Sequence, residues 1–157
     1  MTLSKLTPSE ITSFFVAGVP IPQPRQRHRV MQVNGKYVAT SYVSKSHPVQ
    51  EWKGRIRIIA RNPYETPITR PVEIALEFTL PRPSSRTRKT IENAPYWSTA
   101  RPDIDNLVKA VLDALTDIAW DDDTQVARLM ASKLVAGDDD EVGVMISIKV
   151  MDDHARE

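Results

Sequence analysis

The sequence contains no cysteine in its 157 residues. This absence excludes disulfide bonds, thiolate metal sites and a cysteine nucleophile. A bound metal ion would therefore have to be held by Asp, Glu, His or backbone oxygen atoms.

The sequence also lacks a long apolar segment. No run of residues approaches the roughly 20 consecutive apolar positions that a membrane-spanning helix needs. The first residues do not combine a basic stretch with an apolar core, which is the pattern of a secretory signal peptide. We therefore expect a cytoplasmic protein that does not bind membranes. Its 41% of hydrophobic residues is enough for one globular domain.

The net charge of +1 hides a strong asymmetry along the chain. Residues 1–101 contain 16 Lys or Arg and 6 Asp or Glu, so they carry +10. Residues 102–157 contain 5 Lys or Arg and 14 Asp or Glu, so they carry −9. A basic half suits a polyanion such as DNA, whereas an acidic half suits metal ions or a basic surface. The alternative is that both halves are ordinary solvated surface.

The pattern of apolar residues predicts an α+β fold in a single domain, residues 1–157, with a mixed β-sheet and helices packed on it. We expect residues 1–10 and 151–157 to be loose tails. Alternating or β-branched residues predict strands, an Asn-Gly pair predicts a hairpin turn, and helical spacing of apolar residues predicts two helices. The predicted strands are 11–19, 30–33, 36–40, 72–80, 125–135 and 142–150, with a turn at 137–140 joining the last two; the predicted helices are 48–61 and 105–115.

An acidic cluster is the most informative feature of the sequence. Asp103 and Asp105 lie at the predicted start of a helix, where residues two apart in extended backbone project to the same side. Lys109 follows Asp105 by four residues, on the same helix face. A second acidic group, residues 121–123, comes after the helix. Mg²⁺ prefers carboxylate oxygens, and a nearby lysine can stabilise a phosphate undergoing cleavage. The alternatives are a helix cap and a solvated turn.

The acidic cluster is part of a longer motif that closely resembles the RusA family of Holliday junction resolvases, often carried by phages. An N-terminal segment, Gly18-x-Pro20-x-Pro22 followed by Gln26-Arg27, resembles the opening of the same proteins, so the resemblance extends from about residue 14 to residue 150. The motif reads Asp103-Ile104-Asp105-Asn106-Leu107, Lys109-Ala110 and Asp113-Ala114-Leu115, and then Trp120, Asp122-Asp123-Thr124-Gln125-Val126.

The resemblance implies a homodimer with a RusA-like fold that cuts four-way DNA junctions by paired symmetric nicks, with Mg²⁺ as cofactor and Mn²⁺ as a substitute. It implies that Asp103, Asp105 and Asp123 bind the metal and that Lys109 completes the catalytic set. Because three aspartates are consecutive, Asp122 is the fallback for Asp123.

Basic residues in two segments are the candidates for contact with DNA phosphates. The alternative for the first segment is a solvated basic loop, and for the second segment a disordered loop that orders on DNA. Trp97, close to the acidic motif, could stack on a base, although core or interface packing is the favoured interpretation. The candidates are Arg25, Arg27 and Arg29 in the first segment, and Arg86, Arg88, Lys89 and Arg101 in the second.

Two other functions remain open from the sequence. A nuclease acting on flaps or forks would use the same catalytic residues. A DNA-binding or metal-binding module without catalysis is the alternative from a different class. An architectural DNA-binding protein has no need of carboxylates that repel the phosphate backbone, so cleavage in the presence of Mg²⁺ separates these classes.

Overall fold

A five-stranded mixed sheet forms the centre of the protein. The computed structural model describes residues 11–25, 27–84 and 94–154. The order of the strands is β1 (Ile11–Ala17), β7 (Gly143–Val150), β4 (Val72–Leu80), β6 (Val126–Val135) and β5 (Tyr96–Trp97). The β4–β6 pair is parallel and the other pairs are antiparallel. The predicted α+β class with a mixed sheet is therefore confirmed.

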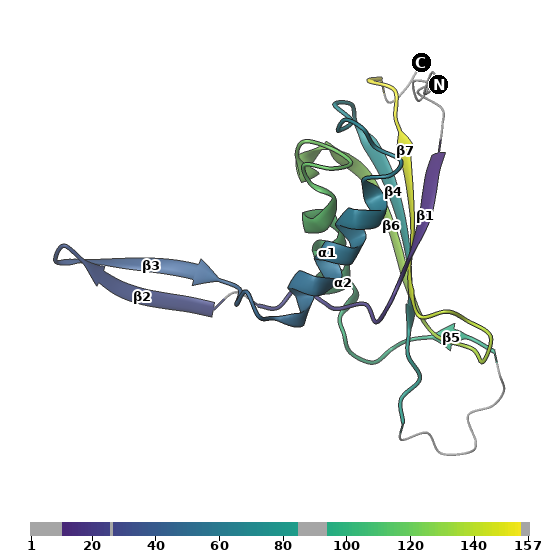
Figure 1. Ribbon diagram of the computed structural model, residues 1–157, viewed down its shortest axis with the longest axis horizontal. Coiled ribbons are helices and arrows are strands. Elements are labelled where there is room, and N and C mark those ends of the chain that lie inside the picture. Colours follow the sequence, from purple (N-terminus) through teal and green to yellow (C-terminus); the bar gives the residue numbers. More distant parts are fainter. Residues whose placement is uncertain (1–10, 26, 85–93, 155–157) are drawn as a thin grey trace.

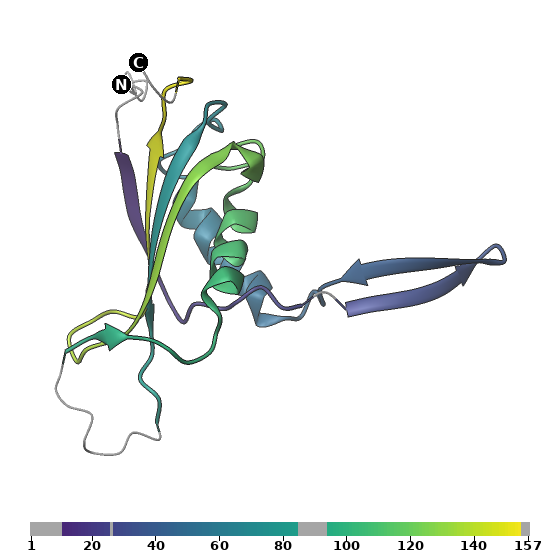
Figure 2. The same ribbon diagram turned by 180° about the vertical axis from the view of Figure 1, so that it is seen from behind.

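Two helices, α1 (Pro48–Ala60) and α2 (Ile104–Leu115), cover one face of this sheet (Figures 1 and 2). The side chains of β4 alternate, so that every second residue is buried beneath the helices. Helix α1 starts at Pro48 because His47 caps it: the Val49 N–H donates to His47 Nδ1 at 3.1 Å. Trp52 and Trp120 are buried. The largest fully buried side chains are Trp120, Phe78, Ile56, Ile74, Leu107, Leu115, Ile146 and Ile148.

A two-stranded hairpin projects away from the sheet and the helices (Figure 1). It consists of β2 (Arg27–Val33) and β3 (Lys36–Tyr42). The turn residues Asn34 and Gly35 have φ of 52° and 77°, which is the left-handed backbone that a two-residue hairpin turn requires. The turn predicted from Asn-Gly is therefore confirmed. Several apolar side chains of the hairpin are exposed, including Val30 and Tyr37.

The predicted turn between the last two strands is present at residues 138–139, but it does not close a hairpin. Strands β6 and β7 do not form a hairpin, because β4 lies between them and pairs with both. The connecting segment instead crosses the end of β4, where the Ala136 N–H donates to Leu80 O at 2.8 Å. An apolar strand such as β4 is buried more completely at the centre of a sheet than at an edge. This pairing depends on contacts between distant segments, so local turn residues could not reveal it.

The short strand β5 was not predicted, because two residues are too few to show an alternating pattern. It extends the sheet beside β6, where Trp97 lies opposite Leu134. Trp97 is 71% exposed. It is therefore not a core residue of this chain, contrary to one of the two packing roles considered from the sequence.

No helix in the described part of the chain is long and apolar enough to cross a membrane.

Candidate active site

Asp103 and Asp105 lie at the start of α2, and both are exposed. Asp103 is the N-cap residue, with extended backbone at φ −69° and ψ 140°. Its side chain makes no capping hydrogen bond, although aspartate is among the residues that most often supply one. The carboxylate is therefore not engaged in holding the helix, and the helix terminus beside it favours negative charge.

Two distant segments fix the position of this helix start. Lys133, on β6, donates from Nζ to Ala100 O at 2.6 Å and to Pro102 O at 2.8 Å. The Gln23 N–H of the proline-rich segment donates to Asn106 O at 2.8 Å. Lys133 thus positions the backbone that leads into Asp103. Sequence reasoning missed this residue, since a lysine in a strand normally indicates no more than an exposed side chain.

Lys109 lies one turn beyond Asp105 on the exposed side of α2. Its nearest carboxylate is that of Asp113: Lys109 Nζ lies 3.4 Å from Asp113 Oδ1. Asp113 Oδ2 forms a second ion pair with Lys53 Nζ of α1, at a distance of 3.2 Å. Asp113 itself is half-buried. In the structure it is a bridge between two lysines from different helices.

The acidic group at residues 121–123 forms a tight turn that leads into the short 3-10 helix η1 (Asp123–Gln125). The Thr124 N–H donates to Asp122 Oδ1 at 2.8 Å, and this backbone hydrogen bond is the main cause of a lowered pKa for the Asp122 carboxyl. Gln125 Oε1 accepts from the N–H groups of Asp121 and Asp122. Asp122 therefore holds the turn, while Asp123 is the exposed first residue of η1.

The two acidic groups lie toward opposite ends of α2. The helix has 12 residues, which corresponds to a length of about 18 Å at 1.5 Å per residue. Asp122 and Asp123 border a hollow together with Asp113 and Asp117, which lie in the last turns of α2 and just after it. Among the described residues, no group of three or more carboxylate or histidine side chains is close enough to hold one metal ion. The structure therefore does not bring Asp123 to Asp103 and Asp105 within one chain.

The predicted DNA-contacting residues fall into three groups. Arg25, Arg29 and Arg101 are exposed. Arg27 opens β2, but its side chain is outside the described part of the structure. The remaining three candidates lie outside the described residues altogether: Arg86, Arg88 and Lys89.

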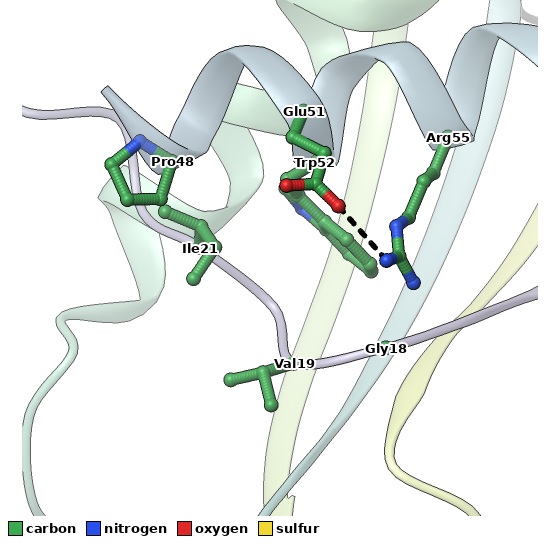
Figure 3. Close-up of a pocket in the computed structure, with 7 residues that line it drawn as sticks. All are labelled: Gly18, Val19, Ile21, Pro48, Glu51, Trp52 and Arg55. Carbon is green, nitrogen blue, oxygen red and sulfur yellow. Dashed lines mark hydrogen bonds and ion pairs between the residues drawn. The ribbon is translucent and has the colours of Figure 1, made fainter. Parts of the chain in front are cut away.

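A second hollow lies between α1 and the segment that follows β1 (Figure 3). Gly18 has φ +123°, a backbone conformation that favours glycine, and its missing side chain leaves room for Arg55 Nη1, which would lie 3.0 Å from a Cβ atom at this position. The carboxylate in this hollow, Glu51, already accepts from Arg55 Nη2 at 2.9 Å. This hollow therefore offers no cluster of free carboxylates for a metal.

Comparison with known proteins identifies the family of this chain. The uncharacterized protein YqaN of Bacillus subtilis (strain 168) is 32% identical over 139 residues, which cover 85% of this chain and 93% of that protein. Residues 18–149, most of the chain and all the candidate carboxylates, match the family described as endodeoxyribonuclease RusA. The chain therefore belongs to the RusA endodeoxyribonuclease family.

Proposed function

We propose that this protein is a Mg²⁺-dependent endodeoxyribonuclease that resolves four-way DNA junctions by paired symmetric nicks, in the cytoplasm of a bacterial cell or a phage-infected host. The observation that carries the proposal is the pair of exposed aspartates at the start of α2, with Lys109 one turn further along, in a chain of the RusA family. The basic N-terminal half supplies charge for the DNA backbone.

The donor groups on this chain fit a hard cation. The candidates are all carboxylates, two of them exposed at a helix N-terminus, and the Asp103 side chain is not used as a cap. Mg²⁺ typically binds one or two carboxylates and keeps several waters; Mn²⁺ prefers the same oxygen ligands. When bound, such an ion activates the attacking water and neutralises charge that develops on the phosphate.

The residues of this chain have separable roles in the proposed reaction. Asp103, Asp105 and Asp123 hold the cation. Lys109 donates to the oxygens of the scissile phosphate, which stabilises the charge of the transition state. Asp113 restrains the lysine through their 3.4 Å ion pair.

The separation of the two acidic groups supports a homodimer. Asp123 lies near the far end of α2 from Asp103 and Asp105, so a single chain presents an incomplete ligand set in its described part. A second copy on a two-fold axis can place its own Asp123 beside the first chain's Asp103. Two such composite sites, related by the same axis, suit a substrate that requires two symmetric cuts.

The DNA arms are proposed to lie against the basic candidates of two segments, one that contains Arg25 and one that leads to Arg101. Arg25 and Arg101 are exposed on the segments that flank the start of α2, since the Gln23 N–H is bonded there. Trp97, exposed on β5, offers an aromatic face to an unstacked base. Arg27, Arg29, Arg86, Arg88 and Lys89 complete the proposed DNA-binding set.

The direct test uses a synthetic mobile four-way junction with end-labelled strands, incubated with the protein and Mg²⁺. We expect symmetric nicks in opposing strands that yield ligatable duplexes. Equal or faster cutting of flap and fork substrates would replace the resolvase by a nuclease for other branched DNA. Binding without any cleavage in Mg²⁺ or Mn²⁺ would favour the non-catalytic module.

A matched pair of substitutions tests which aspartate of the turn is the ligand. Asp123→Asn is expected to abolish cleavage with little change in melting temperature. Asp122→Asn is expected to retain cleavage, because asparagine also accepts the Thr124 N–H bond and caps helices about as well as aspartate. The measurements are the rate of junction cleavage and the melting temperature of each variant. Loss of cleavage in Asp122→Asn alone would reverse the assignment.

A further inference from the structure

The hollow beside the turn at residues 121–123 has a basic wall as well as an acidic one. Lys53 and Arg57 line it from α1, one helical turn apart. Asp122 and Asp123 line it from the turn. Helix α1 is far from the acidic motif in sequence, but it packs beside α2 on the sheet (Figure 2). This packing brings the two cations to the hollow.

The ion pairs of this hollow leave one cation uncommitted. Lys53 is only 12% exposed and is paired with Asp113. Arg57, in contrast, is exposed, and none of the described carboxylates lies within ion-pair distance of it. Its guanidinium makes a single hydrogen bond among the described residues, from Nε to Ala114 O at 3.2 Å.

That hydrogen bond orients the guanidinium without using its outer edge. A guanidinium has five N–H donors in a planar fork, and only the Nε–H is engaged here. The two Nη groups retain the geometry that binds two oxygens of one phosphate. Because the side chain is already restrained by α2, binding a phosphate costs less conformational entropy than it would for a freely moving arginine.

We propose that Arg57 binds a backbone phosphate of DNA, on the strand that passes the turn at residues 121–123. The inference rests on the proposed function, since it takes the turn to be part of a nuclease site. Lys53 keeps the neighbouring Asp113 neutralised, so that this carboxylate does not repel the phosphate. The alternative role of Arg57 is structural, because a cation at the C-terminal end of α2 also interacts favourably with its carbonyl groups.

The test compares Arg57→Gln with Arg55→Gln, a matched control on the same helix. Arg55 points about 200° away from Arg57 around α1, at 3.6 residues per turn, and is paired with Glu51. Binding of a four-way junction and of a plain duplex is measured in EDTA at several salt concentrations. We expect Arg57→Gln to weaken binding about tenfold at low salt and to reduce the log–log salt slope by about 0.9 for each phosphate that the variant no longer neutralises. Arg55→Gln is expected to change neither quantity.

A second variant separates the phosphate role from the structural one. Arg57→Lys keeps the charge but removes the bond from Nε to Ala114 O, so we expect a salt slope close to that of the wild type. If Arg57 only caps α2, both Arg57 variants will lower the melting temperature and neither will change the salt slope, which would overturn the proposal. An unchanged salt slope in Arg57→Gln overturns it at any melting temperature.

The Arg57 proposal and the proposed function are tested by different measurements. Wild-type cleavage of the junction in Mg²⁺ tests the proposed function, whereas the salt slope on plain duplex tests the phosphate contact. A wild type that binds duplex but does not cut, with a reduced slope in Arg57→Gln, would sustain the phosphate site while the proposed function fails. A wild type that cuts junctions, with an unchanged salt slope in Arg57→Gln, would support the proposed function and contradict the phosphate contact of Arg57.

Discussion

The variant Asp103→Asn is expected to cut four-way junctions about a thousandfold more slowly than the wild type, because metal coordination supplies several kcal/mol of transition-state stabilisation. Junction binding is expected to be retained or slightly strengthened, since one negative charge near the phosphate backbone is removed. The fold should not change, because the Asp103 side chain makes no capping hydrogen bond and asparagine is an equally good cap residue. Single-turnover cleavage and equilibrium binding measure the two effects separately.

The control for this variant is Asp139→Asn. Asp139 is exposed in the segment between β6 and β7, so the substitution makes the same change of charge away from α2. Cleavage by Asp139→Asn should equal that of the wild type. If Asp103→Asn also cuts at the wild-type rate, Asp103 does not bind the catalytic metal and the start of α2 is not the active site.

Mixing two inactive variants is expected to restore cleavage. In the proposed dimer each site takes Asp103 and Asp105 from one chain and Asp123 from its partner. A heterodimer of Asp103→Asn and Asp123→Asn chains then has one site with both changes and one intact site. Equal mixing and re-association give about half heterodimers, so about a quarter of the wild-type sites should be active if the dimer is a closed two-fold. The product should be a single nick in place of paired nicks.

The same experiment has a clear negative result. If all the ligands of one site belong to a single chain, each site in the heterodimer lacks one aspartate and the mixture stays inactive. A mixture of Asp103→Asn and Asp105→Asn chains is the control, because both changes lie at the same end of α2 and no intact composite site can form. Cleavage by that control mixture, or none by the first one, would contradict the composite site.

Local sequence signals were enough to predict most of the secondary structure. The strand at residues 72–80 was predicted with its observed bounds, because its alternating apolar residues all face the helices. Asn34-Gly35 predicted the hairpin through its backbone preference, and the helical spacing of apolar residues predicted a helix at 105–115, one residue short of the observed start of α2. The acidic motif also predicted the family, since its residue types and spacing are visible in one dimension.

The tertiary structure decided what lies between these elements. The position of β4 between β6 and β7 depends on strand pairing across long stretches of sequence, on which the turn residues at 137–140 carry no information. The bridge from Lys53 through Asp113 to Lys109 also joins segments that are distant in sequence. The hydrogen bonds from Lys133 to Ala100 O and Pro102 O do so as well, and no local sequence signal indicates them. The sequence by itself determined which carboxylates and lysines are available for catalysis. The distances between these side chains depend on the tertiary structure. Helix α2 is about 18 Å long, so it separates Asp103 from Asp123 within one chain, although both belong to one short sequence motif.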